Sequence, residues 1–473
     1  MKIILLSPKG PLYRHRGGIF KKNLRYAPLT LTTLASLVPA DLNASVEILD
    51  EGIEDIDIDR LQADLVGITA TTGNAVRAYE LADRLRSRGI PVVMGGPHAT
   101  LVPDDAQPHV DSVVVGYAED TWPELLYDFR AGQMKARYVM SPDLSLANRP
   151  FPRRDMMKSQ GFITTHVFET QRSCIHNCDF CVAPNAWGNK PFYKPVEEVV
   201  ADIRQHYDRR IMFIDLNLIN DVDYASRLFE ALIPLKVDWF GLSTTLIYHD
   251  QKLLDLAARS GCSGLLIGFE SISRENQKSV RKGFNRPEEY RAIVDALHKR
   301  GITLMACFTF GLDDDTPDVF METARFAVEA SIDLPRFAIV TPFPGTNLYK
   351  RLDDEGRILT RNWELYDAQH VVFQPKQMSV EQLYSGHEAA WKYSYTIPNM
   401  VRRFMGSRIQ VPVWWVTNFG YRFYAHHLKD FYNCDCFIGQ RDSSKKIDPI
   451  IMPEAVAEPA VSVTEKRDKS PCG

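Results

Sequence analysis

Short apolar segments alternate with segments of helical periodicity along most of this chain, and the alternation restricts the folds that it can adopt. The apolar segments are rich in Val, Ile and Leu, as strands buried on both faces are. In the first part of the chain they are Lys2–Leu6, Val46–Asp50, Leu65–Thr69, Pro91–Met94 and Ser112–Val115. Buried parallel strands separated by helices predict an α/β domain with a doubly wound, Rossmann-like sheet over residues 1–135.

Residues that directly follow the strands of such a sheet line its ligand-binding crevice. Here these positions are rich in Gly, Ser and Thr, which allow a bound group to approach the backbone. The candidate binding residues are Thr69, Thr71, Gly95, Gly96, His98 and Gly116. Two alternatives stay open, because Gly95 and Gly96 also suit a simple strand-terminating turn and a strand-end histidine is often structural.

A second strand–helix series follows a predicted linker over residues 136–160, which contains the sequence RPFPRR. Its strands are expected at Ile163–Thr170, Ile211–Leu216, Trp239–Thr244, Gly264–Ser271, Leu304–Gly311 and Arg336–Thr341. Six strands with intervening helices favour a partial (βα)6 barrel over residues 161–375. Periodicity alone does not separate this barrel from a second open sheet.

The C-terminal part of the chain changes character twice. Residues 376–440 are helical in pattern and rich in aromatic residues, whereas residues 441–473 contain none and are predicted to form a disordered tail. Residues 391–432 combine twelve aromatic side chains with six Lys or Arg and a single acidic residue. Core packing, peripheral contact with a membrane surface and a wall for an apolar substrate are the three interpretations of this segment.

Composition excludes several classes of protein. A net charge of −4 argues against a chain-wide grip on nucleic acid, and no RNA-binding module is recognised, so no nucleic acid partner is expected. No apolar run reaches the ~18 residues of a membrane span. The apolar run after Met1 is too short for a signal peptide, so we expect a cytoplasmic protein that at most touches the inner face of the membrane.

Three of the eight cysteines lie within eight residues, in the sequence CIHNCDFC: Cys174, Cys178 and Cys181. Three thiolates on one short loop indicate metal binding. Zinc requires a fourth protein ligand, whereas a 4Fe–4S cluster held by three cysteines leaves one iron open to a further ligand. An iron–sulfur cluster is favoured, with zinc and buried unliganded cysteines as the alternatives. Cys262 and Cys307, among apolar neighbours, are predicted to be core residues, and Cys434 with Cys436 lacks metal-binding partners.

The cysteine motif follows the first strand of the second series, at the mouth where barrel enzymes place their chemistry. CxxxCxxC with Phe180 before its last cysteine resembles the motif of the radical S-adenosylmethionine (SAM) superfamily. GFES at 268–271, FGLDDDTPD at 310–318 and TPFPGTNLY at 341–349 resemble segments of its cobalamin-associated branch, as do VGIT and GGPH in the N-terminal domain.

This resemblance implies that the three cysteines hold a 4Fe–4S cluster, that SAM binds its open iron and that the N-terminal domain binds cobalamin. The side chains expected to contact SAM are Phe180, Asp215, Asn217 and Glu270. Asp215 and Asn217 alternatively cap the helices that follow them. The D-x-H-x-x-G motif of classical cobalamin domains is absent, which leaves cobalt without a protein histidine, and GYAE at 116–119 replaces the usual Gly-Glu-Gly-Glu.

The resemblance further implies an anaerobic enzyme whose commonest activity is C-methylation of an unactivated carbon. The aromatic C-terminal segment suggests a hydrophobic or polycyclic substrate, such as a lipid or a tetrapyrrole, and flavodoxin or ferredoxin is the expected class of electron donor. No side chain is assigned a catalytic role, since the cofactors carry the chemistry. The alternatives are oxidative cyclisation or rearrangement without methyl transfer, modification of tRNA or peptide, and a zinc- or cobalamin-binding protein without enzymatic activity.

Overall fold

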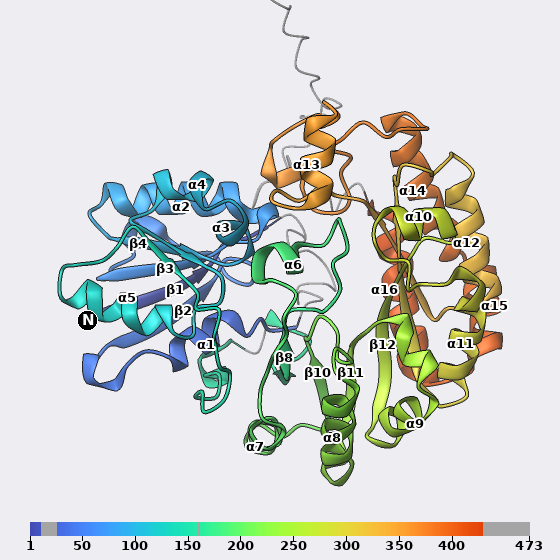
Figure 1. Ribbon diagram of the computed structural model, residues 1–473, viewed down its shortest axis with the longest axis horizontal. Coiled ribbons are helices and arrows are strands. Elements are labelled where there is room, and N and C mark those ends of the chain that lie inside the picture. The colour runs from blue at the N-terminus through green and yellow to red at the C-terminus, as the bar shows by residue number, and fades with distance from the viewer. Residues whose placement is uncertain (11–25, 159–160, 429–473) are drawn as a thin grey trace, which may run out of the picture.

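The computed structural model describes residues 1–10, 26–158 and 161–428. Two six-stranded parallel sheets stand side by side in it (Figure 1). The predicted disordered tail, Cys434 and Cys436 lie outside the described residues, as does the end of the aromatic segment.

The N-terminal sheet has the strand order β2-β1-β3-β4-β5-β6, and all neighbouring strands are parallel. Its strands are β1 (Lys2–Ser7), β2 (Ser45–Asp50), β3 (Leu65–Thr69), β4 (Val92–Gly95), β5 (Ser112–Val115) and β6 (Arg137–Val139). Its helices are α1 (Thr30–Ser36), α2 (Ala75–Ser87), α3 (Pro97–Leu101), α4 (Pro103–Ala106) and α5 (Thr121–Arg130). The predicted doubly wound fold is therefore confirmed.

The two-residue period of the strands explains why helices cover both faces of this sheet. On β1, Ile4 and Leu6 belong to the apolar cluster formed with α2, whereas Ile3 and Leu5 belong to the cluster formed with α1 and α5. Strands buried on both faces need an unbroken apolar sequence, which is what the pattern showed.

Strand β6 lies inside the segment that the sequence analysis assigned to a linker. It is a three-residue edge strand paired with β5, and only its central residue, Tyr138, is buried. A segment this short, with one buried position, gives no apolar run by which to recognise a strand.

The second sheet has its six main strands in chain order, as expected for a partial barrel. These strands are β7 (Val167–Phe168), β10 (Arg210–Phe213), β11 (Asp238–Ser243), β12 (Cys262–Glu270), β13 (Thr303–Phe310) and β14 (Leu334–Ile339). The helices are α6 (Val182–Trp187), α7 (Val196–Gln205), α8 (Val222–Leu232), α9 (Gln251–Arg259), α10 (Arg274–Ser279), α11 (Tyr290–His298) and α12 (Val319–Glu329). Strand β7 is shorter than predicted, because the chain turns at Glu169–Thr170 into a small antiparallel ribbon of β8 (Gln171–Arg172) and β9 (Phe192–Tyr193).

After the barrel the chain forms α13 (Asn347–Asp354), a short helical turn at Trp363–Leu365, α14 (Val380–Ser394), α15 (Ile397–Ser407) and α16 (Val411–His426). Helix α14 packs against β14 and α12, and α16 packs against α14. Trp391, Trp414 and Arg403 are almost completely buried. Core packing therefore accounts for these three members of the aromatic segment.

A single buried carboxylate joins the last two helices to the barrel. Asp333, at the start of β14, accepts hydrogen bonds from Ser407 Oγ (2.5 Å) and Trp414 Nε1 (2.9 Å) through one oxygen. Its other oxygen accepts the Leu304 amide (2.8 Å) and lies 2.9 Å from His298 Nε2. One side chain thus connects α11, β13, α15 and α16.

We expect Asp333→Ala to lower the free energy of unfolding by about 2–4 kcal/mol, because each buried donor left without a partner costs about 1–3 kcal/mol. Urea unfolding followed by tryptophan fluorescence would measure this. Asp143→Ala, in an exposed loop, is the control and should change stability by less than about 0.5 kcal/mol. Equal stability of the two variants would show that Asp333 does not anchor the helices.

Candidate cofactor site

The three clustered cysteines lie on the loop between β8 and α6, at the carboxyl ends of the barrel strands. Cys178 is buried, Cys174 and Cys181 are half-buried, and Cys181 immediately precedes α6. Three distant segments hold the loop backbone. The Asp179 amide donates to Val280 O (3.2 Å), its carbonyl accepts the Leu348 amide (3.0 Å), and the Ile175 amide donates to Asn220 Oδ1 (3.2 Å).

The surroundings of these thiols favour the neutral form in the absence of metal. Burial raises the pKa of all three, that of Cys178 to about 12, while the positive charge of Lys282 acts in the opposite direction. Within the described residues, no three His, Cys, Asp or Glu side chains converge closely enough to share one metal ion. Three soft thiolate donors on one short loop are the donor set of a 4Fe–4S cluster that leaves its fourth iron open to a further ligand.

Glu270 ends β12 beside this loop, as predicted. Its backbone is left-handed (φ 60°) at an irregularity in the pairing of β12 with β13. One carboxylate oxygen lies 2.6 Å from Lys282 Nζ, and the other accepts the Thr309 hydroxyl at 2.8 Å. Contact of Glu270 with SAM stays a prediction. Lys282 was not identified in the sequence, since a lysine within a polar segment carries no sign of burial.

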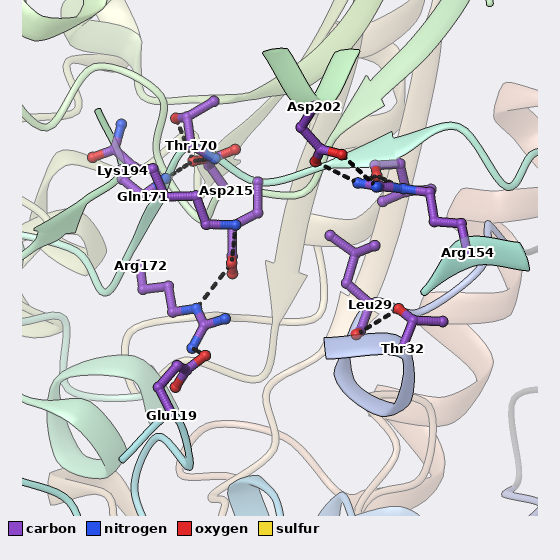
Figure 2. Close-up of polar contacts among 12 residues, drawn as sticks. Leu29, Thr32, Glu119, Arg154, Thr170, Gln171, Arg172, Lys194, Asp202 and Asp215 are labelled. Atoms are coloured by element: carbon purple, nitrogen blue, oxygen red, sulfur yellow. Dashed lines mark hydrogen bonds and ion pairs between the residues drawn. The ribbon is translucent and has the colours of Figure 1, made fainter. Parts of the chain in front are cut away.

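Asp215 and Asn217 are both buried and both support the loops at the barrel mouth. Asp215 Oδ1 accepts the amides of Thr170 (2.9 Å) and Gln171 (2.6 Å), and Figure 2 shows the carboxylate directed toward them. Burial raises the pKa of Asp215 to about 7 against these hydrogen bonds. Asn217 donates to Asn220, which in turn holds the cysteine loop at Ile175.

These contacts give Asp215 and Asn217 a role in fixing the loop that carries the thiols. They do not cap the following helix α8, because its N-cap is Asp221. Their contact with SAM stays a prediction. Phe180 packs, half-buried, against the apolar core of the barrel.

The predicted crevice residues of the N-terminal domain lie together at the ends of β3, β4 and β5. Gly96 has φ 96°, and a Cβ there would lie 2.8 Å from Ala70 O and Thr69 Oγ1. A Cβ at Gly116 would lie 2.5 Å from Met140. Neighbouring protein atoms therefore approach the backbone at both glycines more closely than a side chain would allow. Contact of these glycines with cobalamin stays a prediction.

The other candidates in this domain have partners of their own. Thr71 begins a helical turn and forms a capping box with Asn74. His98 is completely buried, with Nε2 2.8 Å from the Tyr79 hydroxyl and Nδ1 3.3 Å from the Thr72 hydroxyl. Because both ring nitrogens have partners, the geometry favours a structural role for His98. Contact of His98 and Thr71 with cobalamin stays a prediction.

The strand ends of the first domain face the cysteine loop of the second. Helix α3, which begins just after Gly96, packs against α6, which begins just after Cys181 (Figure 1). The turn at Gly345 also contacts Leu101 of α3, and the neighbouring Leu348 amide binds the cysteine loop. The crevice and the thiols thus lie on opposite sides of one narrow junction.

A buried ionic chain crosses this junction. Arg172, two residues before Cys174, pairs with Glu119 of the N-terminal domain and with Glu169 (2.9 Å), and Lys194 also pairs with Glu169 (3.3 Å) (Figure 2). Burial alone would raise the pKa of Glu169, but Arg172 and Lys194 hold it below its ordinary value. Tyr117 covers the guanidinium at 4.8 Å. This contact could not be predicted, since Glu119 and Arg172 are 53 residues apart along the chain.

We expect Arg172→Met to lower the free energy of unfolding by about 3–5 kcal/mol, since it leaves the buried Glu119 carboxylate without its cation. The matched control is Arg153→Met, which removes an exposed pair with Asp155 and should cost at most about 1 kcal/mol. Calorimetry of both variants would measure the difference. A cost below about 1 kcal/mol for Arg172→Met would mean that the ionic chain does not join the domains.

Comparison with known proteins agrees with this geometry. Residues 25–126 match the B12 binding domain family, residues 168–327 match the Radical SAM superfamily, and residues 346–413 match a domain of unknown function, DUF4070. A solved structure of the radical S-adenosylmethionine methyltransferase TsrM from Kitasatospora setae, with cobalamin and a [4Fe-4S] cluster bound, superposes with a TM-score of 0.60 at 17% identity over 75% of this chain and 78% of that one. At this identity the likeness shows the fold, and it confirms a Rossmann-like domain followed by a partial barrel.

Two relatives are more similar in sequence. Bacteriochlorophyllide d C-12(1)-methyltransferase from Chlorobaculum tepidum is 33% identical over 411 residues, which cover 83% of this chain and 87% of that protein. Bacteriochlorophyllide d C-8(2)-methyltransferase from the same organism is 32% identical, over 73% of this chain and 80% of that protein. Identity at this level across nearly the whole of both domains, with three thiols at the barrel mouth, shows that this chain belongs to the family of cobalamin-binding radical SAM methyltransferases.

Proposed function

We propose that this enzyme transfers a methyl group to an unactivated carbon of a hydrophobic, polycyclic small molecule of the tetrapyrrole class. The observation that carries the proposal is the contact of α3 with α6, which brings the crevice of the B12 binding domain to the cysteine loop. The substrate class is supported by the two bacteriochlorophyllide methyltransferases to which the chain is similar. When bound, the 4Fe–4S cluster with SAM supplies a radical that activates the substrate, and cobalamin supplies the methyl group.

The residues of the chain would hold these groups and exclude water. Cys174, Cys178 and Cys181 would bind the cluster from a loop whose backbone is fixed at Ile175 and Asp179. We propose that Glu270 and Phe180 contact SAM and that Thr69, Gly95 and Gly116 contact cobalamin. The proposal is supported by the positions of Glu270, Thr69, Gly95 and Gly116 at the carboxyl ends of their strands. Arg172 is buried at the junction between them, and the rings of Tyr117 and Trp187 stack there 5.3 Å apart. We propose that these side chains help to exclude solvent, which protects a reactive intermediate.

The test is transfer of an isotopically labelled SAM methyl group, by anaerobically prepared protein, to a carbon of a supplied tetrapyrrole. Flavodoxin or ferredoxin, the class of one-electron donor that we propose, would reduce the protein. Labelled product would support the proposal. Cleavage of SAM with an altered but unlabelled product would favour cyclisation or rearrangement, and labelling confined to polar metabolites, peptide or tRNA would contradict the substrate class.

We expect Cys174→Ala to abolish formation of 5′-deoxyadenosine and to lower the iron content, because one of the three cluster ligands is lost. Iron and sulfide analysis and product chromatography would measure both effects. Cys262→Ala is the matched control, since Cys262 is buried in the barrel core and should leave the iron content unchanged. Formation of 5′-deoxyadenosine at the wild-type rate by Cys174→Ala would refute the cluster assignment.

We also propose that the outer surface of α15 and α16 contacts an anionic membrane, which would bring the enzyme to an apolar substrate. Among the described residues, no helix combines the length and apolar character needed to cross a membrane. Ile397, Val401 and Met405 are nevertheless exposed at four-residue spacing along one face of α15. On α16, Val416 is 74% and Phe419 51% exposed. Arg402 and Arg408 are exposed nearby, and no acidic residue occurs between Glu388 and Asp430, so the charge of this surface complements anionic lipid.

We expect the wild-type protein to sediment with phosphatidylglycerol vesicles more strongly than with phosphatidylcholine vesicles. The double change Val416→Asp/Phe419→Asp should weaken binding at least about tenfold, since it removes apolar area and adds negative charge. Ile163→Asp is the control, because Ile163 is equally exposed (64%) but lies outside these helices. Unchanged binding by the double variant, or a dimer in gel filtration that this variant disrupts, would contradict membrane contact.

A further inference from the structure

A lysine ammonium is buried beside the cysteine loop. Lys282 follows α10, its side chain is only 11% exposed, and its Nζ lies 2.6 Å from Glu270 Oε1. Burying a lysine ammonium costs folding free energy unless its charge is compensated. A buried lysine beside the cysteine loop therefore suggests a functional role.

The barrel is built to hold this ammonium in place. A Cβ at Gly268 would lie 2.1 Å from Glu270 Oε1 and 2.7 Å from Lys282 Nζ, so a side chain there would displace the pair. Glu270 adopts its left-handed backbone at the same point, and its second oxygen is held by Thr309. The left-handed backbone of Glu270 and the absence of a side chain at Gly268 thus both accommodate the Glu270–Lys282 ion pair.

The segment that carries Lys282 is also attached to the cysteine loop. Val280 O accepts the Asp179 amide at 3.2 Å, and Arg281 Nε lies 3.1 Å from Asp179 Oδ1. Asp179 lies between Cys178 and Cys181 in the sequence. Lys282 and the thiols therefore keep a fixed separation.

The side chain of Lys282 also lies close to the cysteine loop. Its Nζ is 5.9 Å from the centre of the Phe284 ring, and this ring stacks at 4.1 Å on His176, which lies between Cys174 and Cys178 in the sequence. The Lys282 ammonium and the Glu270 carboxylate are therefore fixed charges beside the loop that carries the thiols. In a site of low dielectric constant, such charges remain effective over several ångströms.

We propose that Lys282 is a positioning residue that sets the reduction potential of the cluster held by Cys174, Cys178 and Cys181, and that Glu270 moderates its effect. One electron from the external donor adds one negative charge to the cluster. A fixed ammonium stabilises that added charge and raises the potential, whereas the paired carboxylate lowers it. The inference rests on the proposed function, because it requires the cluster to be present.

The test is a redox titration of the reconstituted cluster, without SAM, monitored by electron paramagnetic resonance. Lys282→Met should lower the ratio of reduced to oxidised cluster at a fixed potential about tenfold, which is a shift of about 59 mV to more negative potential. Glu270→Gln should shift the potential in the opposite direction, and Lys282→Arg should leave it near the wild-type value. Lys278→Met is the matched control, since it removes a lysine of α10 whose side chain is exposed and therefore screened by solvent.

Shifts of the reduction potential in opposite directions in Lys282→Met and Glu270→Gln would support the proposal. Loss of packing alone would not give shifts of opposite sign in the two variants. Equal potentials in these variants, or shifts in the same direction, would overturn it. If Lys282→Met fails to retain iron, the comparison of Glu270→Gln with Lys282→Arg decides the question. Wild-type protein that binds no iron would instead refute the proposed function, so the two failures are distinguishable.

Discussion

The arrangement of the two domains depends on one buried cation. Arg172 lies between Glu119 of the B12 binding domain and Glu169 of the barrel, with little access to water. Removing these three charges from water costs free energy, and their mutual attraction offsets that cost only while the ion pairs keep their geometry. The contact therefore favours one orientation of the two domains. Because Arg172 is two residues before Cys174, the same interaction also sets where the cysteine loop begins.

The cysteine loop itself is assembled from parts distant in the sequence. Its backbone binds Val280, Leu348 and Asn220, which follow three different barrel strands. The loop can therefore take its final form only after the barrel has closed around it, which couples the formation of the site to the folding of the whole domain. The segment at 341–349, which resembles cobalamin-associated radical SAM proteins, contributes directly to this assembly through Leu348.

The order and type of the main elements could be predicted from the sequence, because buried parallel strands need unbroken apolar runs. Glu270 was found because it ends such a run, whereas β6 was missed because Tyr138 is its only buried position. Lys282, Arg172 and Glu119 could not be predicted. Each is a charged residue in a polar context, and its burial follows from partners brought together only by the fold. The metal ligands were predictable for the opposite reason, since their spacing along the chain is itself the signal.

The C-terminal helices show the same limit of sequence reasoning in a different form. Trp414 and Phe419 are both large apolar residues of α16, but Trp414 donates to the buried Asp333 while Phe419 is exposed. Composition gives the two residues equal weight, whereas the contacts at Asp333 distinguish them. The Asp333 carboxylate accepts Trp414 Nε1, and its carbonyl accepts the Asn418 amide from the same side of α16. With that side turned toward the barrel, Val416 and Phe419 are left on the outside, in a stretch without acidic residues. Buried polar contacts thus help to determine which apolar surface the enzyme presents to its surroundings.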